Sequence, residues 1–95
     1  MALEVVWSPR ALWDLRQIRA FIAADSPGAA DVFCLRLVEM SEEIGQFPEA
    51  GRVVPEIDKP EVRERIIGAY RMVYRVGSAA VEIAAISHGA RLLRI

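Results

Sequence analysis

The sequence has few of the residues that build metal sites and disulfide bonds. Its 95 residues include one cysteine, Cys34, and one histidine, His88. A lone cysteine cannot form an internal disulfide bond, and one cysteine with one histidine cannot assemble a structural zinc site. We therefore expect no bound metal, and we expect no cofactor either.

Long hydrophobic runs are also absent. Charged residues make up 26% of the chain and interrupt every apolar stretch, whereas a membrane span needs roughly 18 uninterrupted apolar residues. The opening residues contain no basic segment followed by an apolar one, so no secretory signal is predicted. We expect a cytoplasmic protein without a membrane span, in which residues 1–95 form a single domain.

The near-zero net charge of −1 hides an uneven distribution along the chain. Residues 1–61 carry six basic against eleven acidic side chains, whereas residues 62–95 carry six arginines against two glutamates. The basic part has two interpretations that the sequence leaves open. It is either a set of solvated strand surfaces or a surface that meets phosphate or an acidic partner.

Two helices are predicted in the first half of the chain, after a short apolar strand over residues 3–7. Each follows a serine and a proline, Ser8-Pro9 and Ser26-Pro27, which suit the N-cap and the first position of a helix. Apolar residues then recur at helical spacing. The predicted core stripes are Ala11, Leu15, Ile18 and Ile22 in the first helix, and Phe33, Leu37, Met40, Ile44 and Phe47 in the second.

Three strands are predicted in the second half, after a proline-containing linker over residues 47–60. They cover residues 62–67, 70–76 and 81–86, with turns at Gly68-Ala69 and Gly77-Ser78. The middle strand alternates, so Tyr70, Met72, Tyr74 and Val76 should pack under the second helix and leave Arg71 and Arg75 on an opposite, basic face. The last strand is apolar on both faces and should be central.

This order of elements predicts an α+β fold with two layers. The arrangement is β-α-α-β-β-β, with a helical hairpin packed on a mainly antiparallel sheet that the first strand joins at an edge or in the middle. Leu12, Trp13 and Phe21 lie outside the narrow core stripe of the first helix. They predict a surface for a protein partner, although packing is the ordinary role of such residues. Cys34 is interpreted as a small core residue.

Three segments carry a resemblance to a known family. They are residues 47–52 (FPEAGR), 68–76 (GAYRMVYRV) and 86–91 (ISHGAR). In this order they resemble the RelE/ParE superfamily of bacterial toxins, and the similarity covers essentially the whole chain. The resemblance implies a toxin that is neutralised by a co-expressed antitoxin. It also implies one of two activities, poisoning of DNA gyrase in ParE-like members or cleavage of mRNA on the ribosome in RelE-like members.

A ribonuclease needs a base, an acid and cations that stabilise the phosphorane. The resemblance implies that Arg63, Arg65, Arg71 and Arg91 would supply the cations. RelE-like toxins also carry a tyrosine several residues after the last arginine, and none occurs here. His88 could replace it, because its ordinary pKa suits proton transfer, although a histidine at a strand end is more often structural.

The missing tyrosine favours a ParE-like toxin that binds the A subunit of DNA gyrase and is not a hydrolase. The expected antitoxin is a ParD-like ribbon-helix-helix protein that forms a hetero-oligomeric complex with the toxin. Its predicted contacts are Leu12, Trp13, Phe21, Arg71 and Arg75, and the predicted contacts with the target are Arg91 and Arg94. A RelE-like ribonuclease is the alternative. A module that has lost its activity and serves only its antitoxin is a third possibility.

Overall fold

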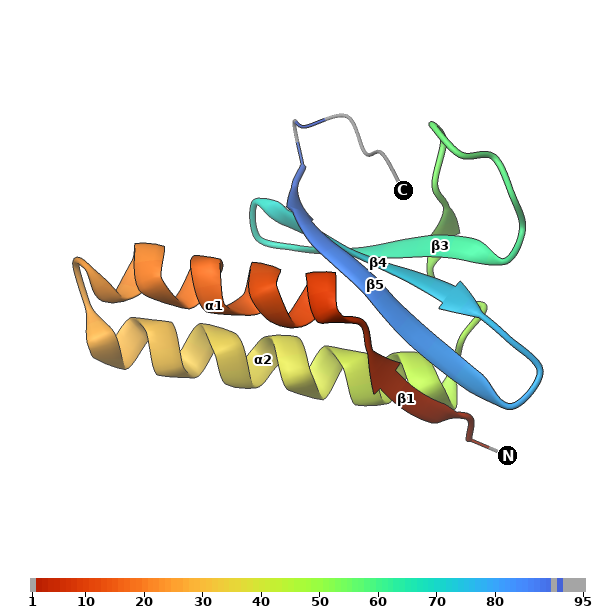
Figure 1. Ribbon diagram of the computed structural model, residues 1–95, viewed down its shortest axis with the longest axis horizontal. Helices are drawn as coiled ribbons and strands as arrows, with labels where there is room; N and C mark the ends of the chain where they lie inside the picture. Colours follow the sequence, from red (N-terminus) through yellow and green to blue (C-terminus); the bar gives the residue numbers. More distant parts are fainter. Residues whose placement is uncertain (1, 90, 92–95) are drawn as a thin grey trace.

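The computed structural model describes residues 2–89 and 91, in which two helices pack on a five-stranded sheet (Figure 1). The sheet order is β1-β5-β4-β3-β2. Strand β1 runs parallel to β5 and the other neighbours are antiparallel, so the predicted α+β fold is confirmed. The elements are β1 (Glu4–Trp7), α1 (Pro9–Ala23), α2 (Pro27–Gln46), β2 (Arg52–Val53), β3 (Val62–Ile67), β4 (Tyr70–Val76) and β5 (Ala80–His88).

Both helices begin where the Ser-Pro pairs predict. The Ser8 hydroxyl accepts a hydrogen bond from the Ala11 N–H at 3.0 Å, and the Ser26 hydroxyl accepts one from the Ala29 N–H at 3.2 Å. Each proline occupies the first turn, where its missing donor costs nothing. Ser8 also donates to the Ala84 carbonyl at 2.9 Å, so the cap of α1 is fixed to β5. Neither helix of the described chain could cross a membrane.

The structure settles where the first strand joins the sheet. Strand β1 lies at an edge beside β5, which is therefore flanked on both sides along residues 81–83. The hairpin between β3 and β4 turns at Gly68, whose φ of +56° is a conformation that side chains disfavour. The boundaries of β3 and β4 agree with the predicted strands, because the Gly68-Ala69 turn separates them and the Gly77-Ser78 turn follows β4.

The helix-facing side of the sheet holds the larger core. Leu37, Met40 and Ile44 from α2 are buried in one cluster with Met72 and Tyr74 from β4, so this part of the predicted packing is confirmed. The prediction that Phe47 belongs to the same stripe is wrong, since its side chain is 65% exposed. Helix α2 ends at Gln46, and the backbone at residue 47 leaves the helical phase that would have turned the ring inward.

The opposite side of the sheet, here called the outer face, is covered and not basic. Residues 54–60, here called the strap, lie over it. A small second core unites Val54 with Val62, Val73 and Ala85, and Ile57 packs against it. Arg71 is only 5% exposed. The prediction of an open basic face is therefore wrong, because the strap supplies both apolar cover and acidic partners.

The predicted linker contains one further strand and a set of anchors. Strand β2 extends the sheet beyond β3 by a two-residue pairing. The buried Tyr74 hydroxyl donates to the Pro48 carbonyl at 2.7 Å and accepts from the Gly51 N–H at 3.1 Å. A Cβ atom at Gly51 would collide with that hydroxyl, so glycine is needed where the chain crosses the ring.

Candidate partner-binding groove

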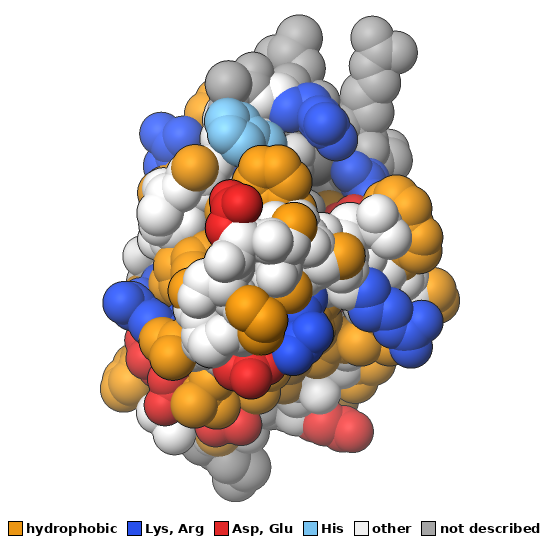
Figure 2. All heavy atoms as spheres, turned by 90° about the vertical axis from the view of Figure 1, so that its left-hand side faces the viewer, with side chains coloured by type: hydrophobic (Ala, Val, Ile, Leu, Met, Phe, Trp, Pro, Cys, Tyr) orange, Lys and Arg blue, Asp and Glu red, His pale blue; other side chains and the backbone are white. Residues whose placement is uncertain are grey.

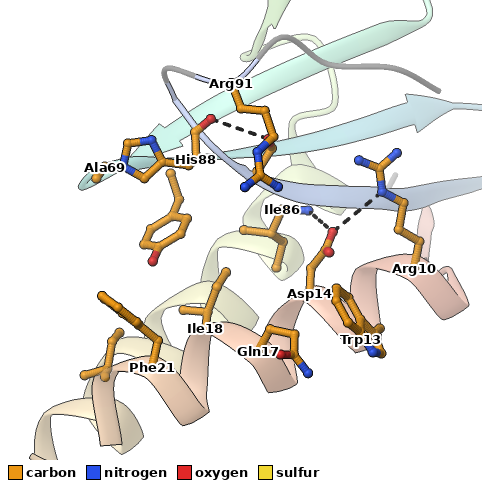
Figure 3. A pocket seen from close by; sticks show the side chains of 13 residues that line it. Arg10, Trp13, Asp14, Gln17, Ile18, Phe21, Ala69, Ile86, His88 and Arg91 are labelled. Atoms are coloured by element: carbon orange, nitrogen blue, oxygen red, sulfur yellow. Dashed lines mark hydrogen bonds and ion pairs between the residues drawn. The ribbon is translucent and has the colours of Figure 1, made fainter. Parts of the chain in front are cut away.

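A groove of about 650 Å³ opens between α1 and the end of the sheet where β4 begins and β5 ends. Figure 3 shows the side chains of α1 and of the strand ends pointing toward the space between them. The lining residues are Arg10, Trp13, Asp14, Gln17, Ile18, Phe21 and Ile22 from α1, and Ala69, Tyr70, Ile86, Ser87, His88 and Arg91 from the sheet side. We treat this groove as the candidate functional site.

Helix α1 lines the groove with side chains that repeat every four residues. Trp13, Gln17 and Phe21 form one such row, and residues four apart lie on the same side of a helix. Trp13 is 60% exposed and Phe21 is 75% exposed. Two large aromatic side chains left in water beside a groove are typical of a protein-binding surface.

Asp14 fixes the position of α1 against β5. Pairing between β1 and β5 ends at Ile83, so the backbone of β5 beyond that point has no strand beside it on this edge. The Asp14 carboxylate accepts the Ile86 N–H at 2.9 Å, and Arg10 lies 3.9 Å from the same oxygen. This contact joins the two walls of the groove through a backbone donor that would otherwise lack a partner.

The sheet wall of the groove carries aromatic and basic groups. The Tyr70 ring lies edge-on to the His88 ring with centroids 5.8 Å apart, and Phe33 packs on the other side of Tyr70. The Arg91 N–H donates to the His88 carbonyl at 3.0 Å. Figure 2 shows the histidine on the surface with basic side chains nearby and hydrophobic side chains below it. The groove therefore combines an apolar floor with a basic rim.

The five candidate ribonuclease residues do not form one site. Arg63 is paired with Tyr74 and Arg65 with Met72. Tyr74 and Met72 face the helices, so both arginines lie on that side of the sheet. Arg71 follows the opposite alternation and lies on the outer face. His88 and Arg91 line the groove, on the helix-facing side and away from Arg71.

Arg63 and Arg65 are engaged in structural contacts. Arg63 donates to the carbonyls of Pro60 and Gly51, each at 2.9 Å, and so ties both ends of the segment that contains the strap. Arg65 forms an ion pair with Glu43 of α2 at 3.0 Å. These side chains hold loops and layers together at the edge of the sheet that the groove does not reach.

Arg71 is neutralised beneath the strap. Its guanidinium makes two hydrogen bonds to the Glu56 carboxylate, at 2.5 and 3.2 Å, and lies 3.3 Å from Glu64. Donation of these hydrogen bonds to the Glu56 carboxylate raises the pKa of Arg71 further above its ordinary value, against the opposing effect of burial.

The structure brings together two of the predicted antitoxin contacts and separates the others. Trp13 and Phe21 line the groove, whereas Leu12 is exposed but does not. Arg71 is buried, and Arg75 is exposed at the far end of β4 on the outer face. The two predicted target contacts have different outcomes. Arg91 lines the groove. Arg94 lies outside the residues that the structure describes.

Asp14, Gln17 and Tyr70 belong to the groove and were not predicted as site residues. Gln17 could have been found from its four-residue spacing between Trp13 and Phe21, because that spacing continues one helix side. Asp14 gave no such signal, since its partner is a backbone donor 72 residues away. In the part of the chain that the structure describes, no group of three or more His, Cys, Asp or Glu side chains could hold a metal ion.

Comparisons with known proteins agree on one family. A family model described as "ParE toxin of type II toxin-antitoxin system, parDE" matches residues 5–93. "Toxin RelE2" of Caulobacter vibrioides is 37% identical over 89 residues, covering 94% of this chain and 98% of that protein. A solved structure titled "Chromosomal ParDE TA system from P. aeruginosa" matches with a TM-score of 0.75 and 21% identity, over 92% of this chain and 96% of that one. The chain thus belongs to the ParE toxin family of type II toxin-antitoxin systems.

Proposed function

We propose that this toxin acts by binding the A subunit of DNA gyrase and does not cut RNA. The observation that carries the proposal is the separation of the candidate ribonuclease residues. Stabilising a phosphorane requires cations that converge on one point. Here Arg71 is paired with two carboxylates on the outer face, and Arg63 and Arg65 are engaged on the other.

The gyrase contact is proposed for the basic rim of the C-terminal part, with Arg91 and Arg94 as its cations. Arg91 is exposed, and an exposed arginine can bind a carboxylate of a protein partner with two hydrogen bonds. This role needs charge and accessibility but no general base.

Neutralisation is proposed to occur at the groove. Membership of the ParE family implies an antitoxin partner, and we propose a ParD-like ribbon-helix-helix protein that forms a hetero-oligomeric complex. The exposed rings of Trp13 and Phe21 suit the apolar side of an amphipathic segment. Arg10, His88 and Arg91 at the rim suit acidic residues on that segment.

The target is tested with purified toxin in two assays, gyrase supercoiling with trapping of cleavage complexes and cleavage of ribosome-bound mRNA. We expect gyrase inhibition, weakened by Arg91→Glu because the charge is reversed, and unchanged by Arg16→Glu on the exposed surface of α1 outside the groove. His88→Ala should leave gyrase inhibition in place. Cleavage of mRNA that disappears in His88→Ala, with supercoiling unaffected, would contradict the proposal.

That outcome would support the second candidate function, a RelE-like endoribonuclease. One observation favours it, since His88 and Arg91 lie in the same groove. A proton-transfer group contributes roughly 10² to 10⁴ in rate. In that case His88→Ala should abolish killing, whereas changes of neighbouring charges should matter less.

The antitoxin site is tested by titrating the cognate antitoxin against toxin variants. Trp13→Ala and Phe21→Ala should each weaken binding about tenfold or more, because large aromatic side chains dominate such interfaces. Ile66→Ala is the matched control, since Ile66 is an exposed apolar residue on β3 away from the groove. If the double variant Trp13→Ala/Phe21→Ala binds as tightly as the wild type, the antitoxin does not use the groove.

A further inference from the structure

Side chains of α1 take the place of a neighbouring strand along the last part of β5. In the part of the chain that the structure describes, pairing with β1 ends at Ile83, although β5 continues beyond it. There the Ser8 hydroxyl donates to the Ala84 carbonyl at 2.9 Å, and the Asp14 carboxylate accepts the Ile86 N–H at 2.9 Å. This edge of β5 is therefore bonded to side chains and not to a strand.

The main chain of Ile86 points away from β4 and toward the groove. Ile86 lies opposite Met72 in the pair of β4 and β5, yet its N–H bonds to Asp14. In an antiparallel pair, the N–H and the C=O of one residue point to the same edge of the strand. A segment lying along this edge can hydrogen-bond to both groups of Ile86, which is how an added strand is held.

The two contacts from α1 differ in how firmly they are fixed. The Ser8 hydroxyl also accepts the Ala11 N–H as the cap of the helix, so moving it would disturb the start of α1. Asp14 lies in the second turn, where its side chain can rotate without changing the helix backbone. Arg10 already lies 3.9 Å from the same carboxylate oxygen (Figure 3). A carboxylate released from Ile86 therefore keeps a cation beside it.

The walls of the groove suit an extended segment at this edge. Side chains of a strand alternate between the two faces of a sheet. One set would point toward α1, where the exposed rings of Trp13 and Phe21 and the side chain of Ile18 line the groove. The other set would point to the outer face. A bound strand should therefore carry apolar residues at every second position.

We propose that the antitoxin enters the groove as an extended segment that pairs with β5, and that its backbone carbonyl displaces Asp14 from the Ile86 N–H. This inference rests on the proposed role of the groove in neutralisation. The displaced carboxylate pairs with Arg10. In the free toxin Asp14 satisfies a backbone donor, and binding must first break that hydrogen bond. Asp14 therefore stabilises the free chain and lowers its affinity for antitoxin.

The proposal is tested on the wild-type complex by NMR couplings across hydrogen bonds. Toxin labelled with ¹⁵N is combined with cognate antitoxin labelled with ¹³C. The Ile86 nitrogen should couple to a carbonyl carbon of the antitoxin, because the hydrogen bond joins the two chains. In free toxin that carries both isotopes, the same nitrogen should couple to the carboxylate carbon of Asp14. A complex of doubly labelled toxin in which the coupling to Asp14 persists would overturn the proposal.

Titration with antitoxin separates the hydrogen bond from the charge. Asp14→Ala and Asp14→Asn both lose the carboxylate charge, but the asparagine oxygen can still accept the Ile86 N–H. Asp14→Ala should therefore bind about three- to tenfold more tightly than Asp14→Asn, the range expected for one hydrogen bond. Glu39→Ala, at an exposed carboxylate of α2 outside the groove, is the control and should bind as the wild type does. Equal or weaker binding of Asp14→Ala would mean that the carboxylate only holds the groove wall in place.

Amide exchange follows the same donor in the variant. Free Asp14→Ala should exchange its Ile86 amide about tenfold faster than the wild type, because the donor has lost its acceptor. Antitoxin should restore the protection. An Ile86 amide that still exchanges rapidly in the complex would contradict the proposed pairing. Circular dichroism checks that each variant remains folded.

The result for Asp14 is separable from the result for the groove. If Trp13→Ala weakens binding while Ile86 keeps its coupling to Asp14, the antitoxin uses the groove without pairing with β5. A segment bound as a helix would give this outcome, and only the inference about Asp14 would be wrong. If Trp13→Ala binds as the wild type does and Ile86 keeps Asp14, the antitoxin does not use the groove, and both proposals are overturned.

Discussion

The two faces of the sheet are closed in different ways. The helix-facing side is covered by α1 and α2 through a continuous apolar cluster that includes Leu37, Ile44 and Met72. The outer face is covered by the strap, whose apolar contacts are limited to a small cluster around Val54 and Ile57. The rest of that cover consists of charged pairs. One face is therefore held by shape and hydrophobic burial, and the other by charges that must compensate one another.

This difference governs how each face tolerates change. The Glu64 side chain is fully buried and relies on Arg71 and on Arg52, whose Nε lies 2.6 Å from its carboxylate. The buried Nε of Arg71 has no hydrogen-bond partner in the described chain. A buried charge that loses its partner is far more costly than a lost methyl group. The outer face should therefore be the more fragile of the two.

The largest expected effect comes from removing the central cation of the outer face. Arg71→Met should reduce the free energy of unfolding by about 3–5 kcal/mol, because Glu64 would remain buried with only Arg52 beside it. Urea unfolding at neutral pH measures the loss. The double variant Arg71→Met/Glu64→Leu is the control, and it should recover most of the stability because an apolar pair fits an apolar layer.

If the double variant Arg71→Met/Glu64→Leu does not recover stability, the Arg71 guanidinium stabilises the outer face by packing and not by neutralising Glu64. A loss below about 0.5 kcal/mol in the single variant, the range of ordinary surface changes, would mean that the strap can open without cost. Either result would remove the contrast between the two faces.

The next effect concerns the helix-facing side. Met40→Ala should reduce the free energy of unfolding by about 3 kcal/mol, because Met40 is buried in the main cluster and its loss leaves a cavity. The loss should be insensitive to salt, since no charge is involved. Leu12→Ala, at an exposed apolar position on α1, should change stability by less than about 0.5 kcal/mol. Equal losses in the two variants would place α2 in the wrong orientation.

The helix-facing side was predictable from the sequence because its signals are local and periodic. Ser-Pro pairs begin both helices, glycine-containing turns bound β3 and β4, and apolar residues recur at every second position of β4. Phe47 continued the same spacing but lies beyond the last helical turn, so spacing alone could not exclude it. The position of β1 beside β5 depends on contacts between the two ends of the chain, which no local pattern encodes.

The outer face was not predictable by the same means. Strand β2 has two residues, too few for a period. Arg71 looked like a solvated strand residue because the partner with which it shares two hydrogen bonds, Glu56, comes from the strap 15 residues earlier. For the groove, Trp13 and Phe21 were identifiable because they fall outside the core stripe. Leu12 met the same criterion, yet it does not line the groove.

The smallest effect concerns the hydroxyl of Tyr74, which holds the segment that contains Pro48 and Gly51 against the sheet. Tyr74→Phe should reduce the free energy of unfolding by about 1–2 kcal/mol at neutral pH, because the Pro48 carbonyl and the Gly51 N–H lose a buried partner. Amide exchange should accelerate at Gly51, which then lacks its acceptor. Tyr70→Phe in the groove is the matched control and should leave exchange at Gly51 unchanged.

The same hydroxyl predicts how stability depends on alkaline pH. Burial raises the pKa of Tyr74 above its ordinary value of 10.0, although the Gly51 N–H and the nearby Arg63 and Arg65 oppose the shift. The folded state therefore retains the Tyr74 proton more tightly than the unfolded state does. The protonated Tyr74 hydroxyl therefore makes its full contribution to the free energy of unfolding below pH about 10, and this contribution is lost as the pH rises above that value. Unfolding free energies measured from neutral to alkaline pH should fall less steeply in Tyr74→Phe than in the wild type, and equal slopes would show that the hydroxyl is not held in a buried anchor.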